Sequence, residues 1–179
     1  MGVLGRVARG VALVVVVTGM SLFGATAVGA QEPAPEAAPA PAFDQRGLPA
    51  DSGAFRRVVY SVGQQRVWWV EDSGEVVNTY LVSGRAGTPG VGTYHVFSKS
   101  RYTSSLNGAA RMEHMVRFAW GRSAAIGFHS IPVNGRGQPL QSEAELGSYR
   151  SAGCVRQANG DAAALYEWAQ VGTQVVVVK

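Results

Sequence analysis

The sequence predicts a mainly β, sandwich-like domain with one late α-helix. Three observations support this fold class. Short runs rich in valine and aromatic residues follow Phe55, turns that contain glycine separate these runs, and apolar residues at helical spacing occur in one segment near the C-terminus. Hydrophobic residues make up 46% of the 179 residues and charged residues 16%, which excludes a wholly disordered chain.

The first strands are expected to form a three-stranded meander. Residues 57–61 and 66–70 flank a turn at 63–65, and a second turn at 72–74 leads into a strand over residues 75–82. Short turns of this kind join strands that are neighbours in a sheet. Three further strands are then expected, over residues 92–98, 112–120 and 126–129.

The one predicted helix covers residues 161–170. Asp161 is a suitable N-cap, apolar residues recur at helical spacing, and Gly172 follows the end. Residues 173–179 form a last strand that is rich in valine and lacks polar alternation, so we expect it to be central in its sheet.

The N-terminal part predicts export. Residues 1–30 have the layout of a signal peptide, with two arginines, an apolar run at 11–17 and small residues at 28–30 before the cleavage site. The apolar stretch is too diluted for a membrane anchor. Residues 31–54 form a linker rich in proline and alanine, and residues 55–179 form one domain. We expect a secreted, cell-wall-associated monomer without a stable membrane anchor after cleavage.

Charge gives little support for nucleic-acid binding. Without the two arginines of the signal, 14 basic residues stand against 12 acidic ones, a net charge of +2. Dedicated nucleic-acid binders usually show a clustered basic face. Nucleic acid is therefore not an expected partner.

Cys154 is the only cysteine, so an intramolecular disulfide is impossible. It is either a small buried hydrophobe or a reactive thiol. A nucleophilic thiol needs an exposing turn, a base and donors for an oxyanion. Gly153 permits a tight turn before the sulfur, and the fixed charge of Arg156 is suited either to hold a carboxylate or to favour the thiolate.

Three histidines are candidates for the base. We expect His95 to be a solvated strand residue and His114 to have a surface or satisfied structural role. His129 ends a short apolar strand before a turn, where catalytic groups often lie. Zinc binding is disfavoured, because separations of 19, 15 and 25 residues among the histidines and Cys154 include no short ligand pair.

Two motifs in the chain are Phe128-His129-Ser130 and Ser151-x-Gly-Cys154-Val155-Arg156. They resemble those of the L,D-transpeptidase (YkuD-type) catalytic domain family of bacterial cell walls, and the resemblance extends over about residues 56–179. The chain departs from the family pattern at Ala152, where the family usually has histidine, and in a long loop over residues 133–150.

The resemblance implies an enzyme that needs no cofactor and acts on peptidoglycan stem peptides. Cys154 would cleave the diamino acid–D-Ala bond of a tetrapeptide stem, and a second stem would resolve the thioester into a 3-3 cross-link. His129 would be the general base and acid, oriented by Ser130, and the Gly153 N–H would bind the oxyanion. Substrate-binding positions would be Ser151, Arg156 and Phe128.

Two other functions stay open on the sequence. One is an L,D-carboxypeptidase or cysteine amidase, in which water resolves the thioester. The other is a wall-binding module that has lost catalysis, which Ala152 makes conceivable although Cys154 and His129 are both present.

Overall fold

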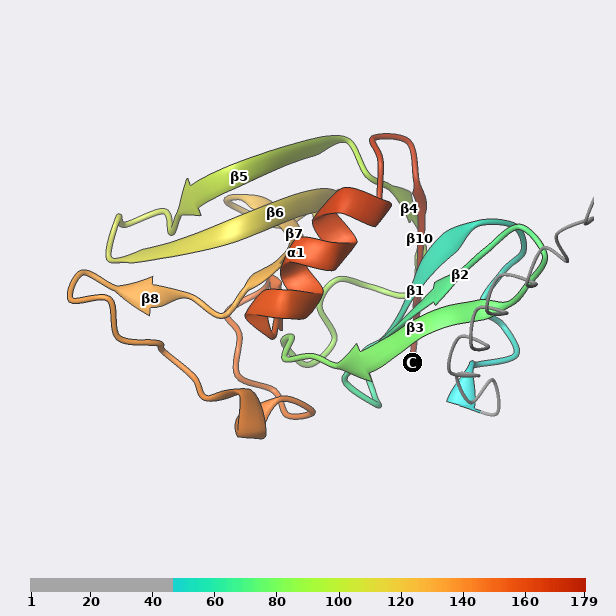
Figure 1. Cartoon of the computed structure of the whole chain (residues 1–179), viewed down its shortest axis with the longest axis horizontal. Helices are drawn as coiled ribbons and strands as arrows, with labels where there is room; N and C mark the ends of the chain where they lie inside the picture. Colours follow the sequence, from blue (N-terminus) through green and yellow to red (C-terminus); the bar gives the residue numbers. More distant parts are fainter. Residues whose placement is uncertain (1–46) are drawn as a thin grey trace, which may run out of the picture. The chain divides into compact units, whose positions relative to one another are not determined.

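Residues 47–179 are described in a computed structural model of the chain (Figure 1). The predicted signal peptide and residues 31–46 of the predicted linker lie outside the described residues. Within residues 47–179, no helix is long and apolar enough to cross a membrane.

The first sheet contains five strands in the order β3-β2-β1-β10-β4. Its strands are β1 (Arg57–Ser61), β2 (Arg66–Val70), β3 (Val76–Leu81), β4 (Gly92–His95) and β10 (Gln174–Val178). Adjacent antiparallel pairs join β1, β2 and β3, which confirms the predicted meander. The valine-rich strand β10 lies between β1 and β4, so its predicted interior position is confirmed as well.

The second sheet has the order β5-β6-β7-β9, and β8 pairs with β6. Its strands are β5 (Ser98–Ser104), β6 (Ala110–Trp120), β7 (Ala125–Ser130), β8 (Val133–Asn134) and β9 (Val155–Gln157). The prediction of one strand over 92–98 is wrong, because β4 ends at His95 and β5 begins at Ser98 in the other sheet. Because the sequence of β5 is polar, it has no apolar pattern that predicts a strand. The strand forms through its backbone pairing with β6.

The helix α1 (Asn159–Trp168) begins two residues before the predicted start. Asp161 is not its N-cap, because the cap position is Ala158, which has no side-chain hydrogen bond, and Asp161 lies in the first turn. The helix packs against β6 and β7 (Figure 1). Leu165 is completely buried. These contacts explain how it forms without a capping side chain.

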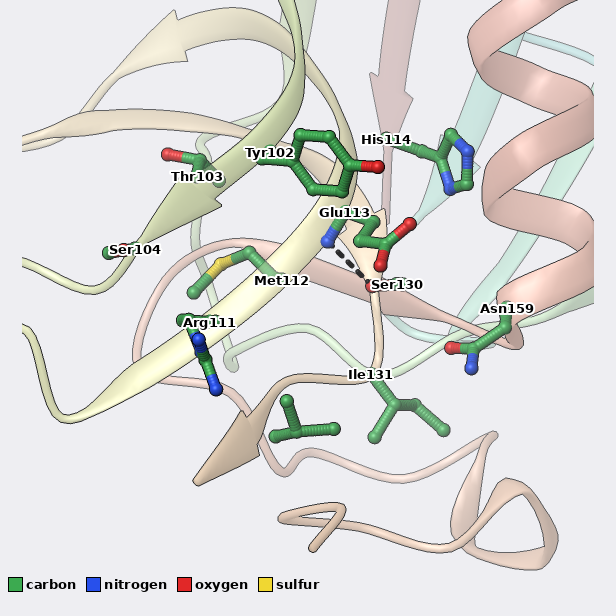
Figure 2. A pocket seen from close by; sticks show the side chains of 11 residues that line it. Tyr102, Thr103, Ser104, Arg111, Met112, Glu113, His114, Ser130, Ile131 and Asn159 are labelled. Carbon is green, nitrogen blue, oxygen red and sulfur yellow. Dashed lines mark hydrogen bonds between the residues drawn. The ribbon is translucent and has the colours of Figure 1, made fainter. Parts of the chain in front are cut away.

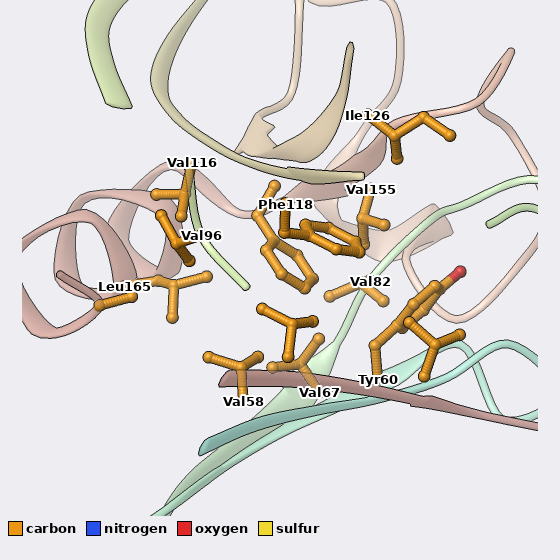
Figure 3. Close-up of a cluster of buried hydrophobic side chains, with 14 of the residues drawn as sticks. Val58, Tyr60, Val67, Val82, Val96, Val116, Phe118, Ile126, Val155 and Leu165 are labelled. Atoms are coloured by element: carbon orange, nitrogen blue, oxygen red, sulfur yellow. The ribbon is translucent and has the colours of Figure 1, made fainter. Parts of the chain in front are cut away.

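One hydrophobic core joins the two sheets and the helix (Figure 3). Phe128 of β7 is central, because its ring stacks on Phe118 at a centroid distance of 4.7 Å and meets Tyr60 edge-on at 6.2 Å. Aromatic contacts of this kind add to the free energy gained by apolar burial. The surrounding fully buried residues include Val58, Val67, Val82, Val116, Val155 and Leu165.

A second cluster covers the other face of the first sheet. It contains Val59, Trp68, Val70, Val76, Val176 and Val178, with Leu48 packed against it. Arg57 Nε donates to the Ser52 carbonyl at 2.6 Å. The strands β1, β2 and β10 are therefore buried on both faces, which accounts for their apolar sequences, and residues of the predicted linker lie on one of these faces.

Candidate active site

Two neighbouring parallel strands carry both sequence motifs. β7 pairs with β9 in the register Phe128 to Val155 and His129 to Arg156. Because successive side chains point to opposite faces, Phe128 and Val155 enter the core and His129 and Arg156 face away from it. Cys154 immediately precedes β9, and a cleft of about 1040 Å³ is lined by His129, Cys154 and Arg156.

The sulfur of Cys154 sits against the backbone of β7. Its Sγ lies 3.7 Å from the Ala125 carbonyl oxygen, and the Gly127 N–H faces it as a donor. A Cβ on Gly127 would come within 2.9 Å of the Val116 carbonyl carbon and 3.0 Å of Arg117 Cα. Only glycine therefore lets β7 approach β6 at the bulge beside the thiol. The sequence signal for this residue is a lone glycine within an apolar strand.

The imidazole of His129 is 3% exposed and held in one orientation. Its Nδ1 lies 2.6 Å from the Ser130 carbonyl oxygen. Because a carbonyl only accepts hydrogen bonds, Nδ1 carries the proton and Nε2 keeps its lone pair. The pKa of His129 is lowered to about 4, chiefly by burial and also by the charge of Arg156, and the bond to Ser130 opposes both. At neutral pH the ring is therefore a neutral base.

The pKa of the half-buried Cys154 thiol shifts in the opposite direction, upward. Burial raises the pKa of its thiol, whereas the Gly127 N–H and the charges of Arg117 and Arg156 lower it. Arg156 thus acts in the predicted direction, but desolvation outweighs it. The resting site holds a neutral thiol and a neutral imidazole.

The loop before Cys154 is fixed by the segment that follows β3. The N–H groups of Arg150 and Ser151 donate to the Gly84 carbonyl at 3.2 and 3.1 Å. Ser83 and Arg156 exchange two backbone hydrogen bonds, at 2.9 and 2.8 Å. These contacts place residues 150–156 beside the first sheet and define one wall of the cleft.

Arg156 also anchors the long loop. Its Nη1 donates to Gln141 Oε1 at 3.2 Å, and Gln141 Nε2 donates to Ser83 Oγ at 2.7 Å. Gln141 and Ser83 are both buried. Pro132 and Leu140 line the cleft, so the loop forms part of its wall.

Ser151 and Gly153 line the cleft as well. The Gly153 N–H, predicted to bind an oxyanion, donates to Ser151 Oγ at 3.1 Å. Gly153 does not have a positive φ, and a Cβ there would meet nothing within 4 Å. The turn before the sulfur therefore does not depend on glycine, contrary to the sequence argument.

The prediction that Phe128 binds substrate is wrong. Its side chain is fully buried in the core and does not line the cleft. The alternation along β7 explains this, because a residue next to His129 must point inward. His95 is exposed on β4, as expected.

A second cavity of about 530 Å³ lies on the other side of Ser130 (Figure 2). Ser130 Oγ accepts a hydrogen bond from the Glu113 N–H at 2.8 Å. His114 lines this cavity, is buried, has a φ of 56° and meets Tyr166 edge-on at 5.6 Å. Among residues 47–179 its Nδ1 has no hydrogen-bond partner, so the predicted surface or satisfied structural role is wrong. Burial and Arg101 lower the pKa of His114.

Metal ligands are not grouped in the part of the chain that the structure describes. Among residues 47–179, no three His, Cys, Asp or Glu side chains lie close enough together to hold a metal ion.

Comparisons with known proteins agree on one family. The model of the L,D-transpeptidase catalytic domain matches residues 56–177. No curated protein matches the chain. Three solved structures have the same fold, and the chain covers only about 60% of each of them. They are the L,D-transpeptidase LdtMt1 in complex with imipenem (23% identity, 70% of this chain and 60% of that one, TM-score 0.56), an L,D-transpeptidase from Mycobacterium smegmatis (22%, 71% and 60%, 0.56) and one from Mycobacterium tuberculosis H37Rv (24%, 71% and 59%, 0.55).

Proposed function

We propose, from the premise that the chain belongs to the L,D-transpeptidase catalytic domain family, that it is an exported peptidoglycan transpeptidase with Cys154 as nucleophile. One observation supports this proposal: Cys154, which immediately precedes β9, and His129 of the neighbouring strand β7 line the same cleft, and His129 keeps Nε2 as its free base. A thiol and an oriented imidazole in one cleft are the groups that acyl transfer requires.

The first half of the reaction forms a thioester. His129 Nε2 accepts the thiol proton while Cys154 Sγ attacks the carbonyl carbon of the third-residue diamino acid. The Gly153 N–H donates a hydrogen bond to the oxyanion. The oxyanion thereby replaces Ser151 Oγ as the acceptor of this N–H. The carbon–nitrogen bond to D-Ala then breaks, and His129 returns the proton to the leaving amine.

The second half of the reaction makes the 3-3 cross-link. The side-chain amine of a second stem attacks the thioester carbonyl, and His129 accepts a proton from that amine. The carbon–sulfur bond breaks and the proton passes to the sulfur, which restores the resting thiol. Water in place of the amine would give hydrolysis, the reaction of an L,D-carboxypeptidase.

Fixed charge assists the step in which the thiol loses its proton. Arg117 and Arg156 both favour the thiolate electrostatically, although Ala152 stands where the family usually has histidine. We assign to these two guanidiniums the charge stabilisation that position 152 does not supply.

The test is a two-part assay of the purified mature chain. Incubation with a disaccharide tetrapeptide should release D-Ala, and mass spectrometry should find dimers joined between third residues. Cys154→Ala, with an unchanged thermal melt, should do neither. Free tripeptide without dimers would show hydrolysis, and D-Ala release by the folded alanine variant would overturn the role of the thiol.

Export is the second part of the proposal. Its basis is the basic, apolar and small-residue order of residues 1–30. Intact mass of the protein recovered outside its native cells should correspond to a chain that begins near Gln31. A mature species that retains residues 1–30 would contradict it.

A further inference from the structure

The cleft around Cys154 is lined by charge of one sign. Four arginines line it, Arg85, Arg117, Arg122 and Arg156, and no aspartate or glutamate does. The neighbouring cavity differs, because Arg111 and Glu113 both line it. A cleft with one sign of charge focuses its field on a ligand of the opposite sign.

None of these four guanidiniums is neutralised within residues 47–179. The ion pairs there are Arg56 with Glu71, Arg101 with Glu113 and Arg150 with Glu145. The cleft arginines bond instead to neutral acceptors. Arg117 donates to Ser100 Oγ at 2.7 Å and to Thr103 Oγ1 at 3.3 Å, and Arg85 donates to the Ala152 carbonyl at 3.3 Å. Their charge is therefore available to a ligand.

Two of the arginines favour the thiolate electrostatically. They are Arg156 and Arg117, and Arg117 pairs with Gly127 across β6 and β7. Arg85 donates to the carbonyl of Ala152, two residues before Cys154, and Arg122 lines the cleft from the turn between β6 and β7. A substrate bound to the thiol therefore shares one cleft with four guanidiniums.

We infer that Arg85, Arg117 and Arg122 make this cleft selective for stem peptides with free carboxylates over stems in which those groups are amidated. The inference rests on the proposed function and names the chemical form of its substrate. Guanidinium binds carboxylate through paired, charge-assisted hydrogen bonds. A carboxamide has no charge, and its NH₂ group presents donors to a side chain that only donates.

The experiment compares two tetrapeptide donors that differ only at the side carboxyl groups of the second-residue glutamate and the third-residue diamino acid, free or amidated. D-Ala release gives kcat/KM for each. At low salt the free-carboxylate donor should be favoured roughly tenfold or more, because one charge-assisted contact contributes about 1.5–3 kcal/mol and tenfold corresponds to about 1.4 kcal/mol. The preference should shrink as sodium chloride is added.

Single substitutions show which arginines cause the preference for the free-carboxylate donor. Arg117→Gln and Arg122→Gln should each lower the ratio of the two kcat/KM values severalfold, and a thermal melt verifies folding. Arg117→Gln should also lower kcat/KM for both donors, because Arg117 favours the thiolate. Arg136→Gln is the matched control, because Arg136 is exposed on another turn, does not line the cleft and should keep the full preference. Arg122→Gln keeps the test decisive if Arg117→Gln unfolds.

Equal kcat/KM for the two donors would overturn the inference and leave the proposed function standing. A preference that survives in both folded variants would also overturn it. Release of D-Ala from neither donor would remove the proposed function and the inference together. Strong inhibition by a glycerol-phosphate oligomer, without donor preference, would assign the arginines to an anionic polymer and overturn it as well.

Discussion

His129 and His114 are both buried histidines with lowered pKa values, yet their surroundings differ in one decisive way. His129 Nδ1 is bonded to the Ser130 carbonyl, whereas His114 Nδ1 has no hydrogen-bond partner in the described part of the chain. Burial alone makes an imidazole neutral. Only the hydrogen bond between Nδ1 and the Ser130 carbonyl also fixes the tautomer, which leaves Nε2 free to accept a proton.

The two rings also face different spaces. His129 lines the cleft with Cys154, and His114 lines the smaller cavity beside Tyr166. Ser130 bonds toward both sides. Its carbonyl accepts a hydrogen bond from His129 Nδ1, and its hydroxyl accepts one from the N–H of Glu113, the residue before His114. The comparison therefore predicts that catalysis depends on one histidine and is nearly indifferent to the other.

The largest expected effect comes from making the same change at both positions. His129→Asn removes the base and should lower the rate of Cys154 acylation by about 10²–10⁴-fold. His114→Asn should leave that rate within about twofold, since asparagine tolerates the positive φ there. Stopped-flow acylation by a carbapenem measures both.

Thermal melts of the two variants are the control, because a buried substitution can also destabilise. Equal losses of acylation rate in folded variants would show that His129 has no special role. A loss confined to His114→Asn would move the active site to the second cavity.

The fall in the rate of Cys154 acylation at acid pH should also reflect the environment of His129. Protonation of Nε2 abolishes the base, so acylation should hold its rate well below the ordinary histidine pKa of about 6.5 and fall with a midpoint near pH 4. A midpoint near pH 6.5 would mean that the ring titrates as a solvated histidine.

Stability should follow the same titration. The folded state binds fewer protons at His129 than the unfolded state between pH 6.5 and 4. The free energy of unfolding therefore falls as the pH falls through this window, by up to about 3 kcal/mol from this group. Urea unfolding at several pH values measures the slope, and His129→Asn should reduce it. An unchanged slope in that variant would assign the acid sensitivity to other groups.

The smallest expected effect is that of Ser130→Ala. The variant keeps the backbone carbonyl that orients His129 and loses the hydroxyl that accepts from the Glu113 N–H. We expect a loss of about 1–2 kcal/mol in the free energy of unfolding and a fall of only a few fold in acylation rate. If acylation fell as far as in His129→Asn, the hydroxyl itself would take part in the chemistry.

Much of the fold was predictable, because strands buried on both faces leave a clear apolar signal. β1, β2 and the interior β10 follow from such runs. β5 did not, since its polar residues 98–104 become a strand only by pairing with β6. Long-range pairing of this kind leaves no local pattern.

The residues of the candidate site also differ in whether the sequence alone predicts them. Cys154, His129 and Arg156 belong to contiguous motifs that predict them from the sequence, and all three line the cleft. Gly127 and Arg117 were missed, because their importance comes from the bulge that brings β6 and β7 together beside the sulfur. The motif alone predicts substrate contact for Phe128, but the alternation along β7 turns its side chain into the core.

The most direct test of the central claim is the mass of the covalent adduct with a carbapenem. The account predicts one adduct per chain, on the peptide that contains Cys154, formed slowly by His129→Asn and absent from Cys154→Ala at an unchanged melting temperature. An adduct on any other residue, or one that persists in folded Cys154→Ala, would contradict the assignment of Cys154 as the nucleophile.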